Sequence, residues 1–217
     1  MSLVSISSKI AEYVTKETEL GLDQTDNVRY GLEIILGALI KGIILLTTAC
    51  FLSILPQVVI ALACGSLLRL VSGGAHCTSY LRCLICGLII YLSAGKIALN
   101  LEKLLNPGQL AVILLPCFLA ILLCACLWAP AEVPYRKLSY KEATFFKSLT
   151  IVFLIVSFTA ALLFANYIRL SFILAGLLAL LVQTFSFTPW GYFTIDKIDG
   201  FLFWITRKQE RRCVGKC

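Results

Sequence analysis

Apolar runs long enough to cross a lipid bilayer recur along this 217-residue chain. A membrane-spanning helix needs about 20 mostly apolar residues. The sequence contains six runs of this kind, at approximately residues 32–55, 57–68, 83–99, 109–128, 149–165 and 170–187. Apolar residues make up 59% of the chain and charged residues only 14%, which is too apolar a balance for a soluble fold. We therefore predict an all-α integral membrane protein with about six transmembrane helices. The second run is short, so it can end early, tilt or feed a re-entrant segment.

Basic residues indicate how these helices are oriented. The net charge is +7, a value that also occurs in nucleic-acid-binding proteins. If the N-terminus is cytoplasmic, fifteen Lys and Arg residues lie on the cytoplasmic side and only Lys96, Lys103 and Arg169 lie outside. That asymmetry follows the positive-inside rule. It predicts cytoplasmic N- and C-termini and removes the need for a nucleic-acid partner.

The chain divides by composition into three parts. Residues 1–30 are polar and lack the pattern of a cleaved signal peptide. In this part Leu3, Ile6, Ile10 and Val14 recur at helical spacing. This spacing is typical of an amphipathic helix on the membrane surface, although a soluble helix packed on the loops fits equally well. We predict an amphipathic cytoplasmic segment at 1–30, a polytopic membrane domain at 31–188 and a basic cytoplasmic tail at 189–217.

One polar stretch, RLVSGGAHCTSYLRCLICG, interrupts the apolar sequence and holds the only histidine, His76. An ionisable residue at membrane depth is costly and suggests function, although a single histidine is often a structural interior residue. Cys83 follows seven residues later, which on one straight helix is about 10.5 Å away. A nucleophile and its base must approach to about 3 Å. If the pair is catalytic, the chain must turn, and Gly73 and Gly74 provide that freedom.

A new helix capped by Thr78 or Ser79 would leave Cys83 in about its first turn. The helix N-terminus and the neighbouring Arg82 would then favour the reactive thiolate. Cys77 is the rival nucleophile, although side chains of adjacent residues usually diverge. Zinc binding is another reading, with four potential ligands in His76, Cys77, Cys83 and Cys86. Structural zinc sites usually draw ligands from two separated pairs, whereas these four residues fall within one short stretch, so we expect no metal here. We also expect no organic cofactor.

Two motifs resemble those of a known family. Arg69-x-x-x-Gly73-Gly74-x-His76 with Cys83 seven residues later is similar to the signature of the accessory gene regulator protein B (AgrB) family. The segment WAPAEVPYRKL, residues 128–138, resembles a second family segment, A-P-x-(D/E)-x-P followed by basic residues. These are bacterial membrane endopeptidases that process the precursor of an autoinducing quorum-sensing peptide. The resemblance covers nearly the whole chain.

The resemblance implies a role for individual residues. His76 would be the general base and Cys83 the nucleophile of a cysteine endopeptidase. Supporting or substrate-binding positions would be Arg69, Gly73, Gly74, Glu33, Arg136 and Lys137. Arg69 would bind a carboxylate, either of the substrate or within the fold. The resemblance leaves open which third group orients His76, and Asp196, Asp199 and Gln183 are the candidates.

The implied reaction is cleavage of the autoinducing-peptide precursor through a thioester, followed by closure of a thiolactone or lactone ring. The expected setting is a bacterial cell membrane crossed several times, with the lipid bilayer as a partner and a homodimer as a further expectation. Two other functions remain open from the sequence. A small peptide or lipid transporter would use Lys41 and the glycine-broken stretch, and a thiol-redox membrane protein would use Cys83-x-x-Cys86.

Overall fold

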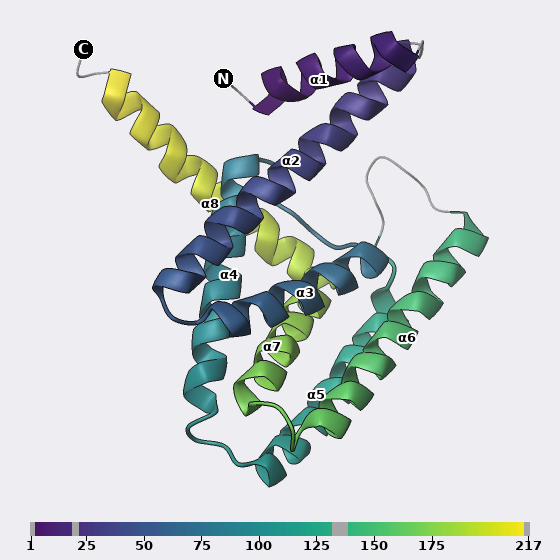
Figure 1. Ribbon diagram of the computed structural model, residues 1–217, viewed down its shortest axis with the longest axis vertical. Helices are drawn as coiled ribbons and strands as arrows, with labels where there is room; N and C mark the ends of the chain where they lie inside the picture. Colours follow the sequence, from purple (N-terminus) through teal and green to yellow (C-terminus); the bar gives the residue numbers. More distant parts are fainter. Residues whose placement is uncertain (1–2, 19–21, 132–138, 215–217) are drawn as a thin grey trace. The chain divides into compact units, whose positions relative to one another are not determined.

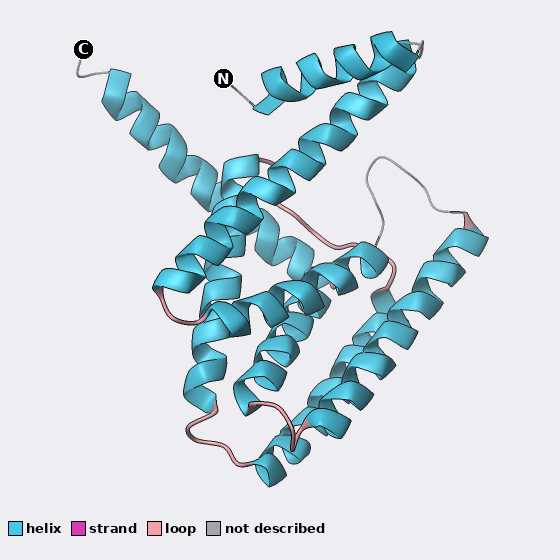
Figure 2. Ribbon diagram, in the orientation of Figure 1, coloured by secondary structure: helices cyan, strands magenta, loops and turns pink. Residues whose placement is uncertain are grey.

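The computed structural model describes residues 3–18, 22–131 and 139–214, and the regular elements in these ranges are all α-helices (Figures 1 and 2). The predicted all-α fold is therefore confirmed. The described part of the chain holds eight helices: α1 (Leu3–Thr18), α2 (Leu22–Phe51), α3 (Leu55–Ser72), α4 (Tyr80–Leu101), α5 (Pro107–Trp128), α6 (Tyr140–Phe164), α7 (Leu170–Ser186) and α8 (Pro189–Val214).

Five of these helices are long and apolar enough to cross a membrane, namely α2 from Val28 onward, α3, α4, α5 and α6. Helices α7 and α8 are joined by an 89° bend, and counting them as one broken span gives a sixth. The prediction of about six spans is confirmed when α7 and α8 are counted together. The protein is a multi-pass membrane protein. Helix α3 is longer than the short second run predicted, because it continues through the polar residues Arg69 and Ser72.

The chain divides into two compact units, residues 1–48 and 49–217. In the first unit, α1 forms the helix predicted from its apolar spacing. The hydroxyl of Ser7 is fully buried and donates a hydrogen bond to Glu33 of α2 (3.2 Å). Arg29 forms ion pairs with Glu33 (3.1 Å) and Asp26 (3.2 Å). Glu33 thus has ordinary structural partners within its own unit.

Helix α7 lies at the centre of the second unit, where it packs against α3, α4 and α5 (Figure 1). Ten of its residues are buried, from Leu170 to Ser186. Several of them are small, such as Ala175, Gly176 and Ala179, and small residues let membrane helices approach closely. Helices α5 and α6 run side by side and complete the bundle. This packing fixes α7 as the scaffold against which the other helices are positioned.

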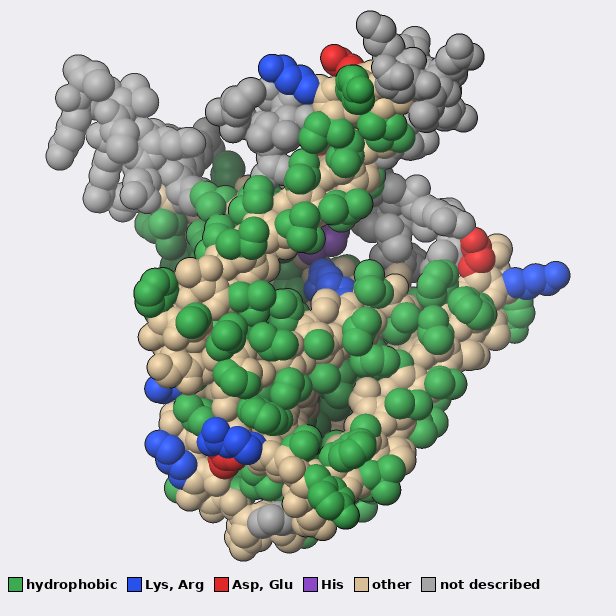
Figure 3. Space-filling model, in the orientation of Figure 1, with side chains coloured by type: hydrophobic (Ala, Val, Ile, Leu, Met, Phe, Trp, Pro, Cys, Tyr) green, Lys and Arg blue, Asp and Glu red, His purple; other side chains and the backbone are tan. Residues whose placement is uncertain are grey.

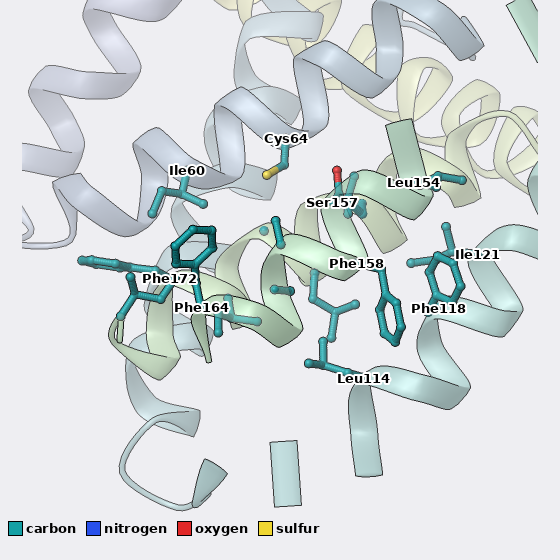
Figure 4. Close-up of a pocket in the computed structure, with 17 residues that line it drawn as sticks. Ile60, Cys64, Leu114, Phe118, Ile121, Leu154, Ser157, Phe158, Phe164 and Phe172 are labelled. Atoms are coloured by element: carbon teal, nitrogen blue, oxygen red, sulfur yellow. The ribbon is translucent and has the colours of Figure 1, made fainter. Parts of the chain in front are cut away.

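The surface of the second unit is as apolar as its spans require. Figure 3 shows hydrophobic side chains spread over the face formed by α3, α5 and α6. An apolar pocket of about 180 Å³ lies among α3, α5, α6 and α7, lined by side chains such as Ile60, Leu114, Phe118 and Phe158 (Figure 4). Of the residues predicted for the functional site, none of those that the structure describes lines this pocket. The chemistry must be sought elsewhere.

Polar interactions stabilise two of the helix ends in this unit. Asn106 and Gln109 form a reciprocal capping box at the start of α5. After the end of α4, Glu102 forms an ion pair with Arg169 (2.8 Å), just before α7. Burial opposes the charge of Glu102, but the hydrogen bonds from Arg169 and Ser171 outweigh it and lower the pKa of this carboxyl. The ion pair connects the C-terminal end of α4 to the N-terminal end of α7.

Candidate functional site

The polar stretch forms a helix–loop–helix break. Helix α3 ends at Ser72 and α4 begins at Tyr80, so His76 lies in the connecting loop. Gly73 (φ +69°) and Gly74 (φ +136°) adopt backbone conformations that other residues rarely adopt. The turn that a His76–Cys83 pair would need is therefore present.

Cys83 lies in the first turn of α4, as predicted. Ser79 is the N-cap residue, and its carbonyl oxygen accepts a hydrogen bond from the amide of Cys83 (3.0 Å). The Ser79 side chain makes no capping hydrogen bond. The thiol of Cys83 is half-buried and not part of a disulfide. It occupies a position where the α4 dipole favours an anion.

Side chains from α3 and α7 hold the loop by its backbone carbonyls. The guanidinium of Arg69 donates to the carbonyl oxygens of Gly74 (3.4 Å) and Ala75 (2.5 Å), and to Oε1 of Gln183 (3.3 Å). Nε2 of Gln183 in turn donates to the carbonyl oxygen of Gly73 (2.8 Å). Arg69 was expected to bind a carboxylate. Its partners among the described residues are carbonyl groups and not a carboxylate of the fold, because the turn after α3 brings those oxygens back over its own side chain.

Two contacts that the sequence did not predict complete this support. The amide of Ala75 donates to the carbonyl oxygen of Ser186 at the end of α7 (3.0 Å). The amide of Ala131, in the second motif, donates to the carbonyl oxygen of Ser72 (2.8 Å). The two motifs therefore meet in space, which spacing along the sequence does not reveal. Arg136 and Lys137 lie outside the described residues.

The ring of His76 is exposed, and its Nδ1 lies 3.2 Å from the carbonyl oxygen of Cys77. A carbonyl oxygen only accepts hydrogen bonds, so this contact assigns the proton to Nδ1 and leaves Nε2 as the basic nitrogen. Among the described residues, no hydrogen bond joins His76 to the Cys83 thiol. The structure thus brings both residues to one loop–helix junction without direct contact between them.

The rival nucleophile, Cys77, is in a different environment. Its side chain is 8% exposed, and its sulfur lies 3.6 Å from that of Cys86. Burial and the neighbouring Cys86 thiol raise the pKa of Cys77 to about 12. Cys77 is therefore protonated at neutral pH, which disfavours it as a nucleophile. Cys86, the second cysteine of the Cys83-x-x-Cys86 pair suggested by the sequence, thus has its sulfur against that of Cys77.

This environment predicts how Cys77 responds to pH. Only the thiolate reacts with iodoacetamide, and a thiol of pKa about 12 is almost entirely protonated at pH 8. Alkylation of Cys77, followed by peptide mass spectrometry, should accelerate roughly tenfold per pH unit from pH 7 to pH 10. A plateau near pH 9, typical of an ordinary thiol, would contradict this assignment.

Arg82 was predicted to add to the effect of the helix start on Cys83, and the structure shows which group its own charge meets. Its guanidinium forms an ion pair with Asp199 of α8 (2.9 Å). The Thr78 hydroxyl donates to the same carboxylate (2.7 Å). Asp199 and Gln183 thus have partners other than His76, and the group that bonds its ring is the Cys77 carbonyl. Thr78, Arg82, Asp199 and the nearby Asp196 and Lys197 line an open polar hollow of about 610 Å³.

The zinc reading receives no support in the described part of the chain, where no group of three or more His, Cys, Asp or Glu side chains could hold a metal ion. The described groups of this junction are of another kind. They comprise an exposed imidazole, a thiol at a helix start and a loop braced from two other helices.

A comparison with known families gives one match. The model of the family described as accessory gene regulator B matches residues 7–187 of the chain. The match includes both motifs and ends just before α8. No curated protein and no solved structure matches the chain.

Proposed function

Since the chain belongs to the accessory gene regulator B family, we propose that it is a cysteine endopeptidase embedded in a bacterial cell membrane. Its substrate is the precursor of a quorum-sensing peptide. Cys83 is the nucleophile and His76 the general base. The enzyme removes the C-terminal part of the precursor and promotes closure of the remaining peptide into a thiolactone or lactone ring.

The observation that carries this proposal is the difference between the two thiols nearest to His76 in the sequence. Cys77 is buried against Cys86 and has a pKa of about 12. Cys83 is half-buried in the first turn of α4, where an anion is favoured. The ring of His76 is exposed, and in the proposed reaction it turns its Nε2 towards Cys83. In unliganded enzymes such catalytic hydrogen bonds are often long and shorten when substrate binds.

In the first half of the reaction, Nε2 of His76 accepts the proton of the Cys83 thiol. The thiolate attacks the carbonyl carbon of the scissile peptide bond and forms a tetrahedral oxyanion. The amides of Gly73 and Ala75 already have partners, so the first-turn amides of α4 are the better donors to this oxyanion. The C–N bond then breaks, His76 protonates the leaving amine, and the thioester remains on Cys83.

In the second half, a cysteine or serine within the peptide gives its proton to His76 and attacks the thioester carbonyl. The ring closes, and the Cys83 thiol regains a proton. Exchange of one thioester for another is nearly balanced in energy, so formation of the acyl-enzyme is the uphill step. Water would hydrolyse that intermediate, and a membrane-embedded site limits its access.

Supporting residues have separate tasks in this scheme. Arg69, Gly73 and Gly74 keep the loop in its turn. The basic residues Arg136 and Lys137 attract the acidic part of the precursor to the membrane surface. Glu33 remains a predicted supporting residue whose described partners are Ser7 and Arg29. The second unit holds the residues to which the proposal assigns the covalent steps.

Trapping the acyl-enzyme tests the proposal directly. The full-length protein in phosphatidylglycerol–phosphatidylethanolamine vesicles is mixed with a synthetic precursor that has an amphipathic N-terminal segment and an acidic C-terminal segment. The internal cysteine of this peptide is replaced by alanine, so that the ring cannot close. We expect the N-terminal fragment to accumulate on Cys83 as an adduct that hydroxylamine removes, detected by mass spectrometry.

The Cys83→Ala variant is the control and should form no adduct. Cleavage without any adduct, or a thioester on Cys77 or Cys86, would exclude the mechanism as written. Transport of the intact precursor into the vesicles without cleavage would instead support the transporter alternative.

A further inference from the structure

One carboxylate outside the two motifs contacts both sides of the catalytic junction. Oδ2 of Asp199, in α8, accepts hydrogen bonds from the Thr78 hydroxyl (2.7 Å) and from Nη1 of Arg82 (2.9 Å). The same Arg82 nitrogen also donates to the backbone carbonyl of Asp199 (3.0 Å). Nη2 of Arg82 donates to the Thr78 hydroxyl oxygen (3.0 Å) and closes the triangle.

Thr78 and Arg82 lie close in the sequence to the two proposed catalytic residues. Thr78 follows His76 by two residues, and Arg82 directly precedes Cys83. Asp199 therefore fixes the chain on the His76 side and on the Cys83 side of the start of α4. The family match ends at residue 187, so the resemblance assigns no role to this residue.

Stability alone is a poor explanation for this network. The side chains of Arg82 and Asp199 are only 14% and 10% exposed. The desolvation of such a buried pair cancels much of its attraction, so its net contribution to folding is small. In addition, Oδ1 of Asp199 is buried and has no hydrogen-bond partner among the residues that the structure describes, and such a group is costly. A buried polar atom without a partner calls for an explanation, and a functional role is one.

We propose that Asp199 is a positioning residue of the catalytic site, which acts through Thr78 and Arg82 to set how closely His76 approaches Cys83. The inference rests on the proposed function, because it takes these two residues as the catalytic pair. Asp199 touches neither the substrate nor the thiol in this scheme. Its loss lets the loop and the start of α4 move apart, and a displacement of about 1 Å can lower a rate roughly 100-fold.

A double-mutant cycle on thiol reactivity separates positioning from a general structural role. The full-length protein in the same vesicles is treated with iodoacetamide at pH 7, and alkylation of Cys83 is followed by peptide mass spectrometry. In the wild-type background we expect His76→Ala to slow alkylation by about tenfold or more. In the Asp199→Asn background His76→Ala should make no further difference. Because the cycle compares His76→Ala in both backgrounds, the change in charge at residue 199 cancels.

Glu102→Gln is the matched control, because it removes a carboxylate that also pairs with an arginine, at the opposite end of α4. It should leave the effect of His76→Ala unchanged. Thr78→Val, which removes only the hydroxyl, should weaken the effect of His76→Ala and serves if Asp199→Asn does not fold.

The outcomes distinguish the two proposals. If His76→Ala slows alkylation equally in the wild-type, Asp199→Asn and Thr78→Val backgrounds, Asp199 is not a positioning residue and the catalytic pair stands. If His76→Ala has no effect in the wild-type background, the pair itself is wrong and this inference falls with it.

Discussion

Replacement of Cys83 by alanine is expected to lower precursor cleavage in vesicles by about 10⁶-fold, to the uncatalysed background. The variant has no nucleophile, and Cys77 cannot substitute because its pKa of about 12 keeps it protonated. His76→Ala should cost about 10²–10⁴-fold, since it leaves the nucleophile but removes the general base. Release of the C-terminal fragment, measured by mass spectrometry, gives both rates.

The matched controls are Cys77→Ala and Cys86→Ala, which remove one thiol each from the neighbouring pair. Both should keep cleavage within a few-fold of the wild type. Full activity of Cys83→Ala would refute the nucleophile assignment. A requirement for both Cys77 and Cys86, with Cys83 dispensable, would instead favour a thiol-redox protein built on the pair that lies 3.6 Å apart.

Gly74→Ala is expected to lower cleavage by about 100-fold or more by distorting the loop that carries His76. At φ +136° an alanine is strained by about 1–3 kcal/mol. Its Cβ would also lie 2.5 Å from the Ser186 hydroxyl and 3.3 Å from Nε2 of Gln183. The loop must then move away from α7, and a shift of about 1 Å costs roughly 100-fold in rate. Steady-state cleavage and the thermal midpoint of the detergent-extracted protein measure the two effects.

Gly87→Ala provides the control for a glycine replaced nearby. Gly87 lies inside α4, and a Cβ there would meet no atom within 4 Å. This variant should keep the wild-type rate and thermal midpoint. Wild-type cleavage by Gly74→Ala would show that the positive-φ turn is not needed for catalysis.

The sequence predicted the fold and the location of the break well, because both depend on local patterns. Apolar run length determined the spans, and two glycines before a polar residue determined the turn. The distance argument between His76 and Cys83 required a new helix before Cys83, and α4 begins at Tyr80. These conclusions need only the neighbours of each residue in the chain.

Several of the supporting contacts could not be predicted, since they join residues more than a hundred positions apart. Arg82 was expected to act on its neighbour Cys83, but its partner is Asp199, 117 residues away. Arg69 was expected to meet a carboxylate, but the carbonyls of its own turn are closer. Local spacing identifies which residues carry charge, and only the packing of α7 and α8 decides where that charge is compensated.

The way the loop is braced has a consequence for how this site can vary during evolution. The carbonyl groups from Ser72 to Ala75 all accept hydrogen bonds from outside the loop. These are main-chain atoms, which every amino acid has. The side chain of Ala75 takes no part in these hydrogen bonds, so substitutions at this position are limited mainly by the space around it. Arg69 and Gln183 donate these hydrogen bonds through their side chains, so they cannot be replaced in the same way. Relatives should therefore preserve Arg69 and Gln183 together, although the two lie far apart in the sequence.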